Sequence, residues 1–148
     1  MNKRYLFFWL LLLAVGPVMT ARAADVKETF SIKDALANDK VKNALVKDVA
    51  LYWGDQSHPK VLQTYGEYKT SKRTNAFGKS REFACQWALA SAIKVLQERA
   101  VREGGNAVIN IRSNVQNNEL SSSDRFECLA GSMMVNAALK GDVVKLAD

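Results

Sequence analysis

A single apolar stripe along residues 79–103 limits the folds that this chain can adopt. Apolar side chains recur there at spacings of three and four residues: Cys85, Leu89, Ala92, Ile93, Leu96 and Ala100. This period predicts a long α-helix with one buried face. Gly104 and Gly105 follow it, and glycine accepts the left-handed backbone that ends a helix. Such a helix needs a second layer of structure to cover its stripe, and we expect that layer to be a β-sheet.

Four segments have the composition or alternation of strands. Residues 49–53 and 61–68 are rich in β-forming side chains, although Gly66 weakens the second segment. In residues 107–111 the pattern predicts Ala107, Ile109 and Ile111 on one face, with Val108, Asn110 and Arg112 on the other. Residues 126–138 form the last strand-like run.

Polar stretches separate these segments and are expected as loops. The first covers Lys69 to Gly78, and the second, Asn114 to Asp124, is expected to be a hairpin loop. Lys140-Gly141-Asp142 is expected to separate the last strand from a short apolar tail.

Residues 31–46 predict a first helix, begun by Ser31 with Asp34 three residues later in a pattern like a capping box. Asn38-Asp39 leaves open a kink or a split within it. The sequence therefore predicts an α+β domain: a small, mainly antiparallel sheet covered by one long helix, plus an N-terminal helix.

The first 23 residues have the pattern of a signal peptide. Lys3 and Arg4 precede the apolar run Tyr5–Val15, and Ala21-Arg22-Ala23 is a small-x-small cleavage motif. Cleavage after about Ala23 leaves residues 24–148 as a single periplasmic domain with no transmembrane segment. The alternative is an uncleaved anchor, which the short run disfavours because a membrane-spanning helix needs about 20 apolar residues.

Cys85 and Cys128 are the two cysteines of the chain. In an oxidising compartment an even pair favours a disulfide. A helix packed on a sheet brings the two sulfurs within reach, and the closed loop constrains the unfolded chain by roughly 3–4 kcal/mol. Two buried free thiols are the alternative. A redox role lacks the Cys-x-x-Cys spacing.

The charge balance disfavours a nucleic-acid binder. The whole chain carries 21 basic and 15 acidic residues, and loss of the signal peptide leaves a net charge of +3. No concentrated basic stripe is present. The densest basic cluster consists of Lys69, Lys72, Arg73, Lys79 and Arg81. We interpret it as a solvated loop, with a weak contact to anionic lipid, peptidoglycan or glycan as the alternative.

Few side chains offer catalytic or metal-binding chemistry. His58 is the one histidine, and it precedes a proline in a turn, where a surface role is expected. One histidine and two cysteines almost exclude a tetrahedral zinc site, and the acidic residues are scattered. We predict no catalytic residue, metal or cofactor. Asp55, His58 and Glu127, together with Cys128, are the candidates for a small-ligand or weak metal site.

Gly78-Lys79-Ser80 matches the second half of a phosphate-binding loop. The first glycine of that motif falls at position 73, which is Arg73, so the backbone cannot wrap around a phosphate. We instead expect Ser80 to cap the long helix.

Several runs resemble a family of small exported proteobacterial proteins that are often labelled "excinuclease ATPase subunit". These runs are residues 54–59, 74–77, 96–100, 104–111 and 138–142. The residues do not support that label, because no complete phosphate-binding loop is present. The helix followed by Gly-Gly-Asn-Ala-Val is also distantly similar to YbjQ-like domains and to the lipoprotein that senses envelope stress in the Rcs pathway. These resemblances imply a compact helix-on-sheet domain that works by contact, sometimes as an oligomer.

The sequence thus favours a non-catalytic periplasmic protein, a binding or envelope-stress accessory module whose partner is another envelope protein. The alternative is a small-ligand or weak metal-binding protein, and self-association stays open. Trp53, Tyr65, Tyr68 and Phe77 form either a contact patch or, as is more usual beside strands, part of the core.

Overall fold

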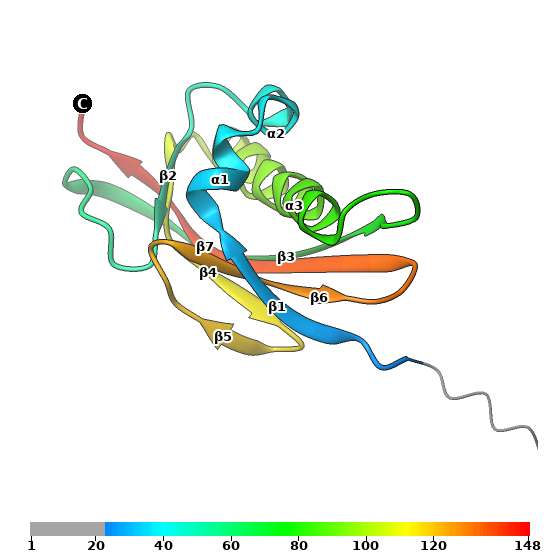
Figure 1. Ribbon diagram of the computed structural model, residues 1–148. Coiled ribbons are helices and arrows are strands. Elements are labelled where there is room, and N and C mark those ends of the chain that lie inside the picture. Colours follow the sequence, from blue (N-terminus) through cyan, green and yellow to red (C-terminus); the bar gives the residue numbers. More distant parts are fainter. Residues whose placement is uncertain (1–22) are drawn as a thin grey trace, which may run out of the picture.

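The computed structural model describes residues 23–148, which form one curled sheet with helices on one side (Figure 1). The elements follow one another as β1 (Val26–Ser31), α1 (Ile32–Ala37), α2 (Asp39–Ala44), β2 (Ala50–Trp53), β3 (Val61–Asn75), α3 (Arg81–Glu103), β4 (Ala107–Val115), β5 (Asn118–Leu120), β6 (Arg125–Ala130) and β7 (Met134–Leu146). The predicted signal peptide lies almost entirely outside these residues.

Strand β7 is the axis of the sheet. It pairs along its whole length with β3, while its other edge is shared by β6 near Val135 and by β4 from Leu139 to Val144. Strands β1 and β2 extend the sheet beyond β6 and β4 respectively. Every pairing is antiparallel except that of β2 with β4. The α+β class and the mainly antiparallel sheet are confirmed, but with seven strands in residues 23–148 the sheet is larger than predicted.

The long helix α3 covers one face of this sheet, as its apolar stripe predicts. The predicted stripe is buried along its whole length, against Val135, Ala137, Leu139 and Val143 of β7. Ser80 caps the helix by accepting a hydrogen bond from the Phe83 N–H at 3.2 Å, and Gly104 ends it in the left-handed conformation. Both helix boundaries follow from sequence rules that the structure confirms.

The predicted N-terminal helix is two short helices. Ser31 begins α1 and accepts from the Asp34 N–H at 3.1 Å, as expected for a cap. Asn38 then adopts extended backbone and caps α2 through its own side chain, so the split at Asn38-Asp39 is real. The same Asn38 amide donates to Gln86 of α3, which holds the break against the long helix. Strand β1, which precedes α1, was not anticipated by the sequence pattern.

The predicted polar loop from Lys69 to Gly78 is wrong in its first part, because β3 continues to Asn75. Each residue from Lys69 to Asn75 has a partner on β7, so the ladder hydrogen bonds stabilise a segment whose side chains are mostly polar. Only Thr70 of this stretch is buried, which explains the missing apolar alternation.

The strand-like run of residues 126–138 is two strands, β6 and β7, joined by a turn at residues 131–133. Lys140-Gly141-Asp142 does not interrupt β7 but lies inside it. A Cβ atom at Gly141 would lie 2.6 Å from Cγ1 of Val108. Glycine therefore occupies this position because the core is close-packed, and not because the chain turns.

A β-bulge at Asn110 overturns the predicted faces of β4. Asn110 has a φ of 51°, and the register with β7 shifts between Ile109 and Arg112. The extra residue places Val108 and Ile111 together on the helix side, where both are buried. Arg112 consequently emerges on the opposite face of the sheet. Beyond it, the expected polar loop is a tight hairpin in which Gln116 and Asn117 have φ values of 54° and 60°.

Cys85 and Cys128 form the predicted disulfide between α3 and β6. Within residues 23–148, no helix is long and apolar enough to cross a membrane. A disulfide is compatible with a protein exported to an oxidising compartment.

Candidate functional site

The face of the sheet opposite α3 carries a set of polar side chains on neighbouring strands. On β3 the alternation places Lys69, Ser71 and Arg73 on this face, and on the neighbouring β7 it places Asn136 and Ala138 there. None of the three helices in the described chain covers this face, which we call the open face (Figure 1).

The open face is hollowed into a groove. One cavity of about 260 Å³ lies beside the β6–β7 turn, and a second of about 620 Å³ lies beside it over the middle of the sheet. Both are lined by Asp25, Arg73, Leu129 and Asn136, so they form one continuous groove. Asn114, Gln116 and Asn117 line its wall near the β4–β5 hairpin. Amides and cations therefore predominate in the groove.

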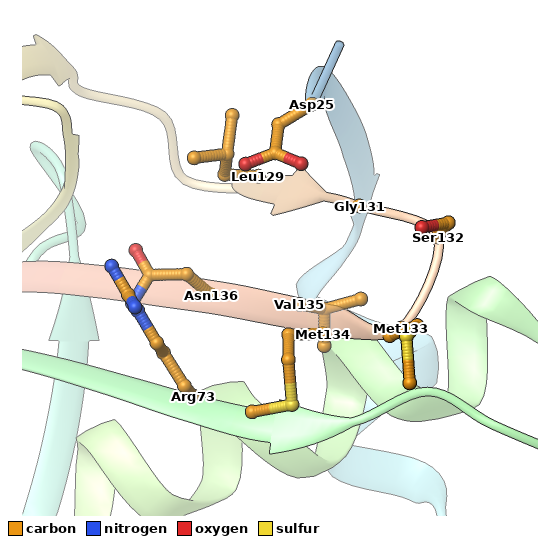
Figure 2. Close-up of a pocket in the computed structure, with 9 residues that line it drawn as sticks. All are labelled: Asp25, Arg73, Leu129, Gly131, Ser132, Met133, Met134, Val135 and Asn136. Atoms are coloured by element: carbon orange, nitrogen blue, oxygen red, sulfur yellow. The ribbon is translucent and has the colours of Figure 1, made fainter. Parts of the chain in front are cut away.

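Arg73 and Asn136 lie side by side on β3 and β7 and point the same way into the cavity (Figure 2). The Asn136 amide donates to Ser71 Oγ at 2.8 Å and to the Lys72 carbonyl at 3.1 Å, which orients its oxygen. Arg73 makes no ion pair with any residue of the described chain, and the same holds for Lys69. The groove thus presents to a ligand two cations that form no ion pair within the described residues.

Asp25 lies across the groove from Arg73, just before β1 (Figure 2). Its Oδ1 lies only 2.6 Å from the place where a Cβ atom of Gly131 would be. Glycine at position 131 therefore lets the carboxylate settle against the β6–β7 turn. The two sides of the groove carry opposite charges: Arg73 is able to bind an anionic group, and Asp25 is able to accept hydrogen bonds.

A network of four charged residues bounds the groove where β7 passes Ala138. Arg112, placed on this face by the bulge, pairs with Glu67 and donates to Glu119 at 2.8 Å. Lys140 pairs with Glu119 as well and lies 3.9 Å from Glu67. The side chains of Arg112 and Lys140 are only 11% and 14% exposed. These two cations are neutralised, in contrast to Arg73 and Lys69.

The network shifts the pKa values of two of its members, Glu119 and Arg112. The hydrogen bond from Lys140, followed by that from Arg112, lowers the pKa of Glu119 to about 2. Burial opposes the charge of Arg112, but its hydrogen bonds with Glu119 and Glu67 outweigh burial and raise its pKa. Glu119 and Arg112 therefore stay charged at neutral pH, and their ion pairs with Lys140 and Glu67 form a boundary of the groove.

The ligand candidates chosen from sequence do not come together. Asp55 and His58 lie exposed in the turn between β2 and β3, where the imidazole packs edge-on against Tyr52 with ring centroids 5.6 Å apart. Glu127 lies on β6, and the Cys128 sulfur is bonded to Cys85. Among residues 23–148, no three His, Cys, Asp or Glu side chains are grouped so that they could hold a metal ion.

The fold places the members of the predicted basic cluster, and those of the predicted aromatic patch, in different surroundings. Lys69 and Arg73 line the groove, whereas Lys72 alternates to the other face of β3. Trp53 is buried and Tyr65 and Tyr68 pack on the core, while Phe77 is 78% exposed. The sequence placed Arg73 only in the basic cluster, with a weak anionic contact as the alternative, and it did not single out Asn136. The signal available was the spacing of Tyr68, Thr70 and Thr74, which alternate with Lys69, Ser71 and Arg73 as a strand requires.

Comparison with protein-family models, curated proteins and solved structures finds no match to this chain. The family resemblance drawn from short sequence runs therefore stays a prediction, and the functional argument rests on the groove itself.

Proposed function

We propose that this chain is an exported, non-catalytic binding module that works in the periplasm. The groove on the open face would hold a polar ligand that carries a carboxylate together with hydroxyl or amide donors. The observation that carries this proposal is Arg73, an exposed guanidinium that lines the groove without an ion-pair partner in residues 23–148. Guanidinium groups bind carboxylates through two parallel hydrogen bonds, which provides orientation as well as affinity.

The chemistry of the groove matches both ends of such a ligand. Arg73 and Lys69 offer positive charge, Asn136 and Asn114 offer amides, and Asp25 accepts hydrogen bonds from hydroxyl or N–H groups. Leu129 and Ala138 supply a small apolar surface between them. An acidic sugar and an acidic peptide both have this combination of groups, and both occur outside the cytoplasmic membrane.

The proposed binding function requires only the side chains that line the groove. Binding uses only groups that the described chain holds in place, and the ion pairs among Arg112, Glu67, Glu119 and Lys140 fasten β3, β4, β5 and β7 together at the groove boundary. The disulfide fastens β6, and with it the wall that carries Leu129, to α3.

Calorimetric titration tests the proposal with three probes. N-acetylmuramic acid and the dipeptide alanyl-glutamate represent the two ligand sources, and N-acetylglucosamine is the neutral counterpart of the first. We expect one acidic probe to bind. Arg73→Gln should lower the affinity for that probe at least about tenfold, because one charge-assisted pair is lost. Arg102→Gln is the matched control, since Arg102 is an exposed arginine on α3. Binding of neither acidic probe, or equal losses in both variants, would overturn the proposal.

A further inference from the structure

Exposed apolar side chains gather at one end of the molecule. Within the described residues six large apolar side chains are exposed, and four of them are Phe77, Met133, Met134 and Val26, with exposed fractions of 78%, 65%, 47% and 52%. We call these four residues the apolar tip. Leu62 and Val101, the other two, lie elsewhere, on β3 near its start and on α3 near its end.

Backbone contacts hold the parts of the apolar tip together. The Ala76 N–H donates to the Met133 carbonyl at 2.8 Å, which joins the β3–α3 loop to the β6–β7 turn. Met134 pairs with Asn75, and Val26 pairs with Ala130 at the start of β1. In Figure 1 the loop, the turn and the beginning of β1 lie at the same end of the sheet. The loop and the turn that carry Phe77, Met133 and Met134 are therefore joined, and Val26 lies at the same end of the sheet.

Phe77 projects outward from a tight turn and is not a displaced core residue. The Lys79 N–H donates to the Ala76 carbonyl at 3.2 Å, and Gly78 has a φ of 70°, as in a type II turn. The Asn75 side chain accepts from the Phe77 N–H at 2.6 Å, and Lys79 Nζ donates to the Asn75 carbonyl at 3.0 Å. The turn is thus fixed, and it exposes an aromatic ring at its corner.

Cations outnumber carboxylates around the apolar tip. Among residues 23–148, five cations lie within five residues along the chain of a tip residue, namely Lys27, Lys72, Arg73, Lys79 and Arg81, against the three carboxylates Asp25, Glu28 and Glu82. Glu28 is already paired with Arg81. Protruding apolar side chains with flanking Lys and Arg match the interface of an anionic bilayer, where apolar groups enter the acyl region and cations meet the headgroups. A protein partner would require a complementary pocket for each protruding side chain, whereas lipid adapts to any shape.

The position of the N-terminal sequence also favours a membrane as the partner of the apolar tip. Ala24 and Asp25 lead into β1 at this end of the molecule, and the apolar run of residues 5–15 ends eleven residues before Val26. Eleven extended residues span at most about 40 Å. A chain exported with this segment leading therefore brings the apolar tip close to the membrane first. We propose that the apolar tip docks the domain on an anionic phospholipid surface, beside the groove whose first cavity Met133 and Met134 also line.

Sedimentation with vesicles tests this proposal. The exported protein is purified in the form that the cells produce after any processing, and mass spectrometry identifies its N-terminus. It is then mixed with phosphatidylcholine vesicles, with or without phosphatidylglycerol. We expect binding to the anionic vesicles that falls with added salt. Replacing Phe77→Ser and Met133→Ser together should weaken it at least about tenfold, and Lys79→Gln should weaken it about fivefold.

The matched control replaces Leu62→Ser and Val101→Ser, two side chains of comparable exposure away from the tip. We expect this control to change binding less than twofold. The proposal is overturned by failure of the native protein to bind anionic vesicles, or by equal losses in the two double variants. It is also overturned by unchanged binding of the tip variant, which would assign membrane attachment to the N-terminal segment.

Discussion

Cys85 and Cys128 join the long helix to strand β6, with their Cα atoms 5.9 Å apart. In the described chain β6 pairs with the central strand β7 through two residue pairs, Leu129 with Asn136 and Ala130 with Val135. Strand β1 is attached to the sheet through β6. The disulfide therefore secures the two strands that form one wall of the groove.

Replacing Cys85→Ala and Cys128→Ala together is expected to lower the free energy of unfolding by about 3–4 kcal/mol, because the loop of 43 residues is no longer closed in the unfolded chain. Denaturant titration measures this loss. Hydrogen exchange in the variant should quicken in β1 and β6 more than in β4 and β7. Uniform exchange across the sheet would show that β7 alone is sufficient to hold β6.

Gly141 lies against Val108 in the core, with no room for a further carbon atom between them. Gly141→Ala places a Cβ atom 2.6 Å from Val108 Cγ1 and should cost about 1–3 kcal/mol through overpacking. Adding Val108→Ala makes room, so the double variant should lose less stability than the sum of the single variants. Val115→Ala, another buried valine, serves as the control and should be additive with Gly141→Ala. Additivity in both pairs would refute the contact.

The bulge at Asn110 determines which face receives Arg112. Asn110→Gly should preserve stability within about 0.5 kcal/mol, because glycine accepts the positive φ of 51°. Asn110→Val should cost at least about 1–2 kcal/mol, since a β-branched residue is strained there. The Asn110 amide also donates to Asp142 at 3.2 Å, so Asp142→Ala measures the loss of that hydrogen bond alone. Equal stability of the Gly and Val variants would argue against the bulge.

The charge network predicts a pH dependence at the acidic end. The pKa of Glu119 falls from its ordinary 4.5 to about 2 in the folded chain, so its ion pairs contribute stability that is fully present above pH 4.5. That contribution is lost as the pH falls toward 2, where the carboxylate is protonated. Comparing the unfolding of the native protein with Glu119→Gln should show a difference at pH 7 that disappears near pH 2.

Glu98→Gln is the control for this comparison, because Glu98 makes an exposed pair with Lys94 at 3.9 Å. Exposed helix pairs contribute little, so this variant should match the native protein throughout the pH range. A stability difference for Glu119→Gln that is as large at pH 2 as at pH 7 would contradict the assigned ion pairs.

Local rules predicted the parts of the fold that depend on local chemistry. Ser80 and Gly104 delimit α3 as their capping preferences require, and the apolar stripe places Cys85 where it meets Cys128. Residues 69–75 were mistaken for a loop, because pairing with β7, which lies far along the sequence, stabilises a polar strand. The bulge at position 110 could not be predicted, because it is set by the register of β4 against β7, which lies far along the sequence.

The candidate site depends on the same long-range pairing. Arg73 and Asn136 are neighbours because β3 and β7 are in register, and no spacing in the sequence links two residues so far apart. The sequence directed attention to His58, which has distinctive chemistry but lies exposed in a turn. Ordinary residue types become a candidate site here through their placement on an uncovered face.

The central claim is that the open face, and not the helix-covered side, binds ligand. Amide chemical-shift mapping of ¹⁵N-labelled protein with N-acetylmuramic acid and alanyl-glutamate tests it directly. The account predicts that shifts concentrate at Ser71, Arg73 and Asn136, and at the Gln116–Asn117 turn. Shifts centred on α3 near Trp87 or Val101, or no shifts with either acidic probe, would contradict it.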